Sequence, residues 1–289
     1  MDERAIGVFD SGVGGLTVVR EIMHHTPAER LVYFGDTARL PYGSKSPETV
    51  LAYARQIIRF LKTHDVKAIV VACNTASAYA LPTIEKEIDI PIIGVLKPGA
   101  KAATDVTKSG RIGVIATEGT IASGMYEKTI RQLRPASEVF GKACPLFVPL
   151  VEEGMTNDDL LRQVAERYLK DVLARDIDTL IMGCTHYPLI SEQIAAVAGE
   201  GVTLVNPACE TAKRLKQLLT EHDIAADPQS VSAGTEIICK AGVTTKVSGA
   251  GMPAHEFYVS DGAEKLAKFA ESILPCNIYK ATKIDIEKY

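Results

Sequence analysis

Short runs of apolar residues alternate along the chain with longer stretches in which apolar residues recur every three or four positions. The short runs are rich in β-branched residues and have the length of buried strands, whereas the longer stretches have the period of amphipathic helices. Apolar strands that alternate with helices are typical of a parallel sheet covered on both faces. In the first part of the chain the pattern predicts strands at residues 5–10, 30–36, 67–72 and 92–95, and helices ending near 25 and spanning 47–62 and 76–88.

The same alternation restarts near Lys97-Pro98-Gly99, which is therefore a candidate domain boundary, and Asn206-Pro207 is a second. Between and after these points we expect strands at 111–116, near 139, at 146–148, 179–182 and 202–205, and helices at 120–133, 157–174, 191–198 and 207–222. The last part alternates more like antiparallel or mixed strands. There we expect strands within 230–239 and 256–260, loops at 223–228 and 241–253, and a final helix at 263–272.

Composition narrows the class of protein. The 289 residues are 46% hydrophobic and 24% charged, which is ordinary for a globular chain. The net charge is -4 and no long run of one sign occurs, so nucleic acid is not an expected partner. The apolar runs are too short to span a bilayer, and the N-terminal residues lack the pattern of a secretory signal. We therefore expect a cytoplasmic protein without a membrane partner.

Two of the six cysteines stand in similar settings. The segment from Ala68 to Thr75 resembles the segment from Thr179 to His186, because each is a buried-strand pattern that ends in a small residue, a cysteine and two polar residues. No pair of cysteines has the C-x-x-C spacing of a metal or redox site. The general interpretation of a cysteine is a small buried hydrophobe, and we keep it for the four others, Cys144, Cys209, Cys239 and Cys276.

Cys73 and Cys184 each follow a predicted strand end, where open α/β sheets bind their ligands. Inversion of a stereocentre by proton transfer requires a base on one face and an acid on the other, and two thiols in two similar lobes could supply both. A free thiol is only a few per cent ionised at neutral pH, so each needs an assisting group. Ionisable residues near predicted strand ends or loops are Asp10, Glu152 and His186.

Several motifs together resemble the glutamate racemase family. The resemblance runs in order from about residue 5 to residue 262. It is carried by residues 10–15 (DSGVGG), 35–37 (GDT), 41–44 (PYGS), 73–77 (CNTAS), 117–120 (TEGT), 149–154 (PLVEEG) and 183–189 (GCTHYPL). The paired cysteine motifs are specific to the aspartate/glutamate racemase superfamily, and the PYGS segment favours the glutamate branch.

The resemblance implies an α/β fold of two pseudo-symmetric lobes, each a largely parallel sheet flanked by helices, with the active site in the cleft between them. Residues 1–97 would form the first lobe and 98–206 the second, while 207–289 would return to complete the first and add a C-terminal helix. The family is cofactor-independent, with neither pyridoxal phosphate nor a metal. It usually forms homodimers and supplies D-glutamate for peptidoglycan.

The resemblance also implies a role for each matching residue. Cys73 would act on D-glutamate with support from Asp10, and Cys184 would act on L-glutamate with support from His186 and Glu152. Glu152 is chosen over Glu153 on motif alignment alone. The substrate pocket would be lined by Asp10, Ser11, Pro41, Tyr42, Gly43, Ser44, Asn74, Thr75, Thr117, Thr120, Thr185 and His186.

Three other functions remain open at this stage. A racemase acting on aspartate or a hydantoin would share the two thiols and differ in the pocket. A two-lobed binding protein would close on an amino acid without chemistry. A cysteine acyl-transfer enzyme would use Cys184 beside His186 and leave Cys73 without a role. The glycines after Asp10 resemble a phosphate loop but lack the full G-x-G-x-x-G pattern.

Overall fold

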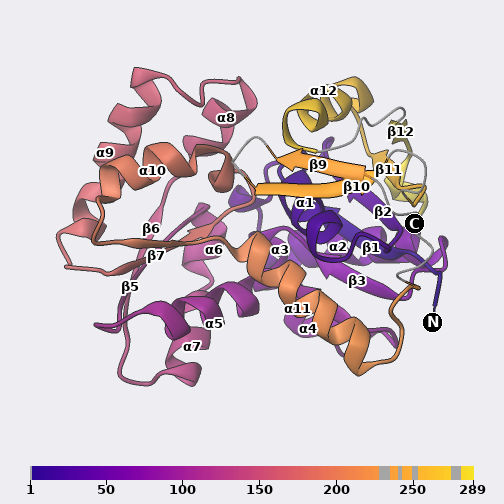
Figure 1. The fold of residues 1–289 in the computed structure, drawn as a ribbon, viewed down its shortest axis with the longest axis horizontal. Helices are drawn as coiled ribbons and strands as arrows, with labels where there is room; N and C mark the ends of the chain where they lie inside the picture. Colours follow the sequence, from indigo (N-terminus) through magenta and orange to yellow (C-terminus); the bar gives the residue numbers. More distant parts are fainter. Residues whose placement is uncertain (1, 228–234, 240–242, 249–252, 275–280) are drawn as a thin grey trace.

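Two separate parallel sheets organise the chain (Figure 1). The computed structural model describes residues 2–227, 253–274 and 281–289, together with the backbone of 235–239 and 243–248. The larger sheet has the strand order β12-β11-β2-β1-β3-β4, and every neighbouring pair in it is parallel. Its strands are β1 (Ile6–Asp10), β2 (Leu31–Gly35), β3 (Ala68–Val71), β4 (Ile92–Gly94), β11 (Glu256–Val259) and β12 (Ala281–Lys283).

The smaller sheet has the order β6-β5-β7-β8 and is also parallel throughout. Its strands are β5 (Arg111–Ala116), β6 (Glu138–Ala143), β7 (Thr179–Gly183) and β8 (Thr203–Val205). A separate antiparallel pair consists of β9 (Thr235–Cys239) and β10 (Val243–Ser248). Figure 1 shows the two parallel sheets side by side, each with its own helices, and both chain ends near the larger sheet. The α/β fold of two lobes predicted from the sequence is thus confirmed.

Helices cover both sheets because their apolar faces must be buried against the strands. The helices that follow strands of the larger sheet are α1 (Leu16–His25), α2 (Pro47–Lys62), α3 (Asn74–Tyr79), α4 (Leu81–Ile84), α5 (Leu96–Val106) and α12 (Ala263–Ile273). The others are α6 (Glu118–Ala122), α7 (Met125–Leu133), α8 (Phe147–Glu152), α9 (Asp159–Leu173), α10 (Ser191–Ala198) and α11 (Pro207–Glu221). Short 3-10 turns span Tyr42–Ser44, Tyr187–Ile190 and Ile286–Lys288. Within the described part of the chain, every helix is too short or too polar to span a lipid bilayer.

Helix α11 follows the smaller sheet in sequence, yet its apolar side joins the core of the larger one. Ala212, Leu215 and Leu219 pack in one buried cluster with Ile6 and Val8 of β1. The proposed division at residues 97 and 206 remains an interpretation of the sequence, and the first of these positions falls in the first turn of α5.

The strand predicted at 146–148 is wrong, since these residues lead into α8. Pro149 is the third residue of that helix. The first four N–H groups of a helix have no partner within it, so a proline costs no hydrogen bond there, whereas in a central strand it would remove one. The edge of the smaller sheet is formed by β6, and Cys144 follows directly with its N–H bonded to Ala116.

The expectations for the last part of the chain are corrected in two places. Residues 256–260 were expected in antiparallel or mixed strands, but β11 is parallel to both β2 and β12. Its alternating burial reflects a half-exposed face near the sheet edge rather than antiparallel pairing. The loop expected at 241–253 contains β10, which pairs with β9. Residues 228–234, 240–242 and 249–252 of these predicted segments lie outside the described residues.

Two predicted helices are each divided. The helix at 76–88 is broken where Pro82 enters, because proline cannot continue the hydrogen bonding of α3 into α4. The helix at 120–133 is divided by Gly124, whose φ of 63° lies in the left-handed region that glycine favours. Strand β12, after the final helix, was not predicted.

Candidate active site

Cys73 follows strand β3 and caps the N-terminus of helix α3. Its Sγ accepts a hydrogen bond from the N–H of Ala76 at 3.5 Å and donates one to Oγ of Ser11 at 3.6 Å. The side chain is buried, with the residue 5% exposed. Burial, and next the nearby Asp10 carboxylate, raise the pKa of this thiol to about 12. Cys73 is therefore protonated at rest, while the N–H of Ala76 is placed to stabilise a thiolate.

Asp10 ends strand β1 and is completely buried. Its Oδ2 accepts hydrogen bonds from the N–H groups of Gly12 at 3.1 Å and Gly15 at 3.0 Å. Burial raises the pKa of this carboxyl group, and the charge of His186 and the backbone N–H groups oppose that rise. Its other oxygen, Oδ1, is buried and has no hydrogen-bond partner among the described residues. One acceptor atom of Asp10 is thus free to receive a proton or a donor group.

Cys184 follows strand β7, at the position in the smaller sheet that corresponds to Cys73 in the larger one. Its Sγ lies 3.8 Å from Nδ1 of His186, and Nε2 of the same imidazole lies 3.1 Å from Oε1 of Glu152 at the end of α8. Burial alone would lower the pKa of His186, but its contacts with Cys184 and Glu152 raise that pKa to about 10. The hydrogen bond to His186 lowers the pKa of Glu152 to about 2. The imidazole is thus held as a cation beside the thiol.

Lys265 extends this series of contacts and was not singled out in the sequence. Its Nζ donates to Oε2 of Glu152 at 2.8 Å, so that helix α12 is connected to helix α8. The contact joins segments 113 positions apart in the chain. Lysine is frequent on exposed helix faces, and no sequence pattern distinguishes this one.

Hydroxyl groups of helices α3 and α6 meet at the junction of the lobes. Oγ1 of Thr75, which lies on α3, is 2.9 Å from that of Thr117 and 3.1 Å from that of Thr120. The last two are 3.0 Å apart. Asn74 accepts a hydrogen bond from the hydroxyl of Tyr126 at 2.7 Å, again across the lobes. The structure thus brings together four of the polar residues expected in the pocket.

The segment 41–44 lies against the second lobe. A Cβ atom added to Gly43 would meet Cβ of Thr117 at 2.7 Å, which is closer than real Cβ contacts. Tyr42 is buried and its hydroxyl donates a hydrogen bond to the carboxylate of Asp36, which anchors the segment to the first lobe. Pro41 and Ser44 are exposed. Among the residues 41–44 expected in the pocket, Gly43 therefore makes the close contact with the second lobe.

The glycines after Asp10 allow a second close approach. A side chain on Gly14 would overlap Thr185 and His186, and one on Gly15 would overlap Asp10 and the hydroxyl of Tyr33. Gly14 thus allows close contact between the lobes, whereas Gly15 makes room for groups within the first lobe. Nearby, Oγ1 of Thr17 in α1 donates to the carbonyl of Thr185 at 2.9 Å. The first lobe therefore holds the backbone of Thr185, a residue expected to line the pocket, by a hydrogen bond.

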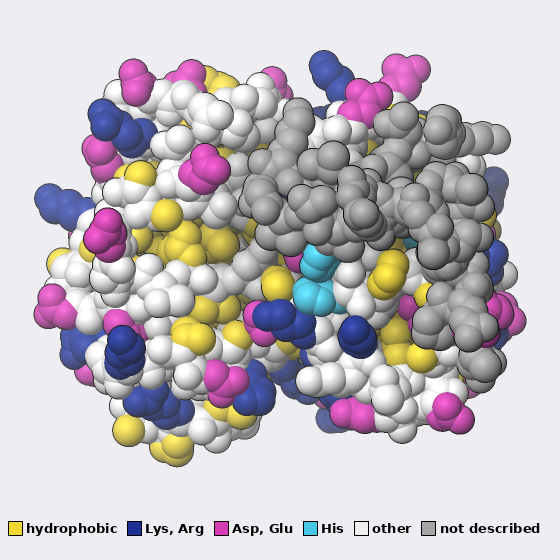
Figure 2. Space-filling model, viewed as in Figure 1, with side chains coloured by type: hydrophobic (Ala, Val, Ile, Leu, Met, Phe, Trp, Pro, Cys, Tyr) yellow, Lys and Arg dark blue, Asp and Glu magenta, His cyan; other side chains and the backbone are white. Residues whose placement is uncertain are grey.

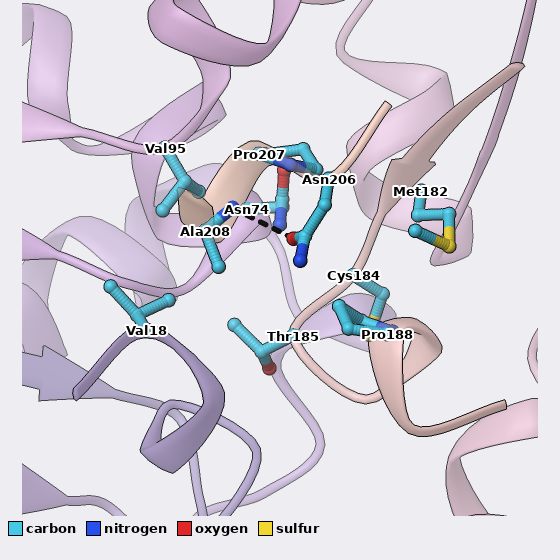
Figure 3. Close-up of a pocket in the computed structure, with 10 residues that line it drawn as sticks. All are labelled: Val18, Asn74, Val95, Met182, Cys184, Thr185, Pro188, Asn206, Pro207 and Ala208. Carbon is cyan, nitrogen blue, oxygen red and sulfur yellow. Dashed lines mark hydrogen bonds between the residues drawn. The ribbon is translucent and has the colours of Figure 1, made fainter. Parts of the chain in front are cut away.

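A small cavity lies beside Cys184 (Figure 3). It is lined by Asn206, Pro207 and Ala208 at the start of α11, together with Asn74 and Thr185. In the close-up, Asn206 projects between Asn74 and the strand that carries Met182, and its side chain accepts from the N–H of Ala208 at 3.0 Å. The sequence marked Asn206-Pro207 only as a boundary. The topology adds that α11 starts next to a candidate catalytic thiol.

The arrangement has the parts needed for proton transfer on two sides of one bound molecule. A thiol with a carboxylate neighbour lies at one strand end, and a thiol with an imidazole neighbour lies at the other. Both thiols are almost fully buried, at 5% and 6% exposed for Cys73 and Cys184. Reacting groups on either side are thus shielded from bulk water in this arrangement.

Comparison with known proteins identifies the family. The sequence pattern of the family described as Asp/Glu/Hydantoin racemase matches residues 6–215. A glutamate racemase from Geobacter metallireducens is 52% identical over 219 residues, which cover 76% of this chain and 81% of the relative. The glutamate racemase isoform RacE1 from Bacillus anthracis superposes with a TM-score of 0.88 at 39% identity, covering 99% of this chain and 98% of that one.

A second solved structure includes a ligand. Glutamate racemase from Francisella tularensis in complex with D-glutamate superposes with a TM-score of 0.85 at 36% identity, and each chain is covered completely. The two structural matches extend over 99% and 100% of this chain. The chain therefore belongs to the glutamate racemases of the Asp/Glu/Hydantoin racemase family, which are isomerases that racemise an amino acid.

Proposed function

We propose that this enzyme interconverts L-glutamate and D-glutamate by proton transfer at the α-carbon between two thiols. The observation that carries the proposal is the matched position of Cys73 and Cys184, each just beyond the carboxyl end of a strand in one of the two parallel sheets. The relative crystallised with D-glutamate supports the choice of substrate.

In the direction from L to D, the thiolate of Cys184 removes the α-proton and the thiol of Cys73 delivers a proton to the opposite face. One C–H bond breaks and one forms, and the thiolate character moves from Cys184 to Cys73. The reverse reaction starts from the thiolate of Cys73. The raised pKa of Cys73 favours its protonated form, which suits it as the acid in the first direction.

Each thiol has its own assisting group in this scheme. The imidazolium of His186, held by Glu152, stabilises negative charge on Cys184 at 3.8 Å. On the other side, the free Oδ1 of Asp10 is the acceptor that can take the proton from Cys73 or hold the substrate ammonium group. The two thiols therefore lie beside groups of different chemistry, an imidazole at Cys184 and a buried carboxyl group at Cys73.

Hydroxyl and backbone groups would bind the two carboxylates of glutamate. Thr75, Thr117 and Thr120 offer hydroxyls at one point, and their contacts with one another can be exchanged for contacts with a carboxylate. Ser11, Asn74 and Thr185, together with the backbone at Gly43, would provide further donors. Preorganised donors of this kind stabilise the carbanion as charge develops, which a weakly acidic α-proton requires.

This chemistry needs neither pyridoxal phosphate nor a metal ion. The product D-glutamate would supply peptidoglycan synthesis in the cytoplasm. We further propose a homodimer and a division of the chain at about residues 97 and 206, with 207–289 completing the first lobe. The core that α11 shares with β1 supports this assignment of the return segment.

The circular dichroism of glutamate, followed with purified enzyme in deuterated buffer, tests the function. Separate samples of L- and D-glutamate should both decay to zero signal with deuterium at the α-carbon. If aspartate or a hydantoin racemises and glutamate does not, the substrate assignment is wrong. If glutamate binds without exchange or inversion, the binding-protein function is favoured. A covalent acyl-enzyme on Cys184 would favour acyl transfer.

A further inference from the structure

A cluster of three potential metal ligands lies outside the active site, between helices α1 and α11. Glu21 and His25 are four residues apart on α1 and therefore share one face of the helix. Cys209 lies in the first turn of α11. One ligand atom from each residue lies within 4.8 Å of the other two, and Sγ of Cys209 is 3.8 Å from Nε2 of His25.

We propose that Glu21, His25 and Cys209 form a binding site for Zn²⁺, with water as the fourth ligand. Carboxylate, imidazole and thiolate together suit zinc, whereas magnesium and calcium prefer oxygen ligands alone. Tetrahedral zinc with Zn–S of about 2.3 Å and Zn–N of about 2.1 Å places sulfur and nitrogen roughly 3.6 Å apart. The observed separation of 3.8 Å needs only a small side-chain adjustment. From the sequence alone, Cys209 was interpreted as structural.

Protonation favours His25 as a ligand. Burial, and next the neighbouring His24, lower the pKa of His25, so its imidazole is neutral and free to bind a cation at neutral pH. Burial raises the pKa of Cys209, so its thiol must release a proton to solvent as zinc binds. With Glu21 and the thiolate as ligands, the charge of the bound ion is balanced within the site.

Basic groups lie close to this site: the side chain of Lys213 interacts with the thiol of Cys209 as well as with Glu210, and the charges of Lys213 and Lys216 act on His25. Arg20 contacts Oε1 of Glu21 at 3.0 Å, and Lys213 contacts Glu210 at 2.7 Å. A carboxylate has two oxygens, so Glu21 can keep Arg20 while it binds zinc. All three ligand residues are partly exposed, which leaves a path for the ion. In the space-filling view, histidine side chains reach the surface near the middle of the molecule, with Lys and Arg side chains close by (Figure 2).

Zinc at this position would connect the two helices that flank the junction of the lobes. Cys209 directly follows the residues of α11 that line the cavity next to Cys184. On α1, Thr17 bonds to the carbonyl of Thr185. Because bound metal stabilises only the folded arrangement, zinc should raise the melting temperature.

A zinc titration against a chromogenic chelator, with the reduced enzyme, tests the proposal. The wild type should bind one zinc outside the catalytic thiols, and Co²⁺ in its place should show thiolate charge-transfer absorption. His25→Gln and Cys209→Ser should each weaken binding by about 100-fold or more, since even outer partners of a metal contribute 10- to 100-fold. At zinc 100 times its Kd, the wild-type Tm should rise by roughly 5 °C, and the variants should lose that rise.

Two controls locate the ion. His222→Gln removes an exposed histidine at the end of the same helix α11 and should leave binding unchanged. Cys184→Ser should also retain the site. Zinc lost in Cys184→Ser and kept in His25→Gln would place the ion at the active site and overturn the proposal. Unaltered affinity in both His25→Gln and Cys209→Ser would overturn it as well. The Tm of each variant is first measured in metal-free buffer. A value equal to that of the wild type shows that the variant is folded, so that weaker zinc binding reports loss of a ligand.

Discussion

Nζ of Lys265 lies 2.8 Å from Oε2 of Glu152, while Oε1 of the same carboxylate lies 3.1 Å from Nε2 of His186. One carboxylate therefore connects the C-terminal helix of the larger sheet to an imidazole of the smaller one. Glu152 is held from two sides, and only 10% of its side chain is exposed. This arrangement fixes the orientation of His186 towards Cys184.

Lys265→Met should reduce kcat/KM for glutamate about two- to fivefold. Lys265 is 53% exposed, so its ion pair contributes little stability, and the loss should come from a less fixed Glu152. Because the equilibrium constant of racemisation is 1, kcat/KM must fall equally for both enantiomers. Lys265→Arg should restore the rate, and Lys268→Met, on the same helix, should not change it. Loss of activity in both methionine variants alike would show that the effect is not specific to Lys265.

Glu152→Gln should destabilise the enzyme most at mildly acidic pH. The pKa of Glu152 falls from 4.5 to about 2 and that of His186 rises from 6.5 to about 10. The ion pair is therefore fully charged, and contributes its full stability, between pH 4.5 and pH 6.5, which are the ordinary pKa values of the two groups. Its contribution declines as pH rises from 6.5 through 10, where the imidazole loses its proton, and as pH falls from 4.5 through 2.

Urea denaturation of wild type and Glu152→Gln over a pH series measures this difference. Between pH 4.5 and pH 6.5, we expect the free energy of unfolding of Glu152→Gln to be lower than that of the wild type by about 3 kcal/mol, as for a broken buried ion pair. The loss should shrink steadily towards the raised pKa of His186. A difference that stays constant, or grows, as pH rises would contradict the assignment of charge to this imidazole.

Gly43→Ala should lower turnover more than it lowers stability. The added methyl group would meet Cβ of Thr117 at 2.7 Å and separate the two lobes where they approach each other. A displacement of about 1 Å at reacting groups can cost about 100-fold in rate. The matched control is Gly12→Ala, where the new Cβ meets only Leu40, at an ordinary 3.4 Å. Steady-state kinetics should show a larger fall in kcat for the Gly43 variant, and equal falls would remove the steric explanation.

The strands were largely predictable because buried parallel strands are continuous apolar runs. The exceptions have local causes. The run near Phe147 is apolar enough for a strand, but Pro149 fits the first turn of a helix. The alternation near Phe257 suggests antiparallel pairing, and only the position of β11 near a sheet edge explains it. The division at Gly124 depends on a backbone angle that the sequence does not show.

At the candidate site, the sequence identified groups that stand in motifs but not the contacts between distant segments. The positions of Cys73 and Cys184 beyond strand ends could be predicted because each follows an apolar run and has polar neighbours. The pairing of Lys265 with Glu152, and that of Tyr126 with Asn74, depend on how the lobes pack. Lysine and tyrosine on helices have no local pattern that marks such a role.

The most direct test of the two-thiol mechanism is inversion and α-deuterium incorporation by Cys73→Ser and Cys184→Ser in deuterated buffer. The mechanism predicts that each variant folds and loses inversion of both enantiomers by at least about 100-fold, the usual contribution of a general acid or base. Inversion at the wild-type rate in either variant would show that one thiol is sufficient, and would contradict the mechanism.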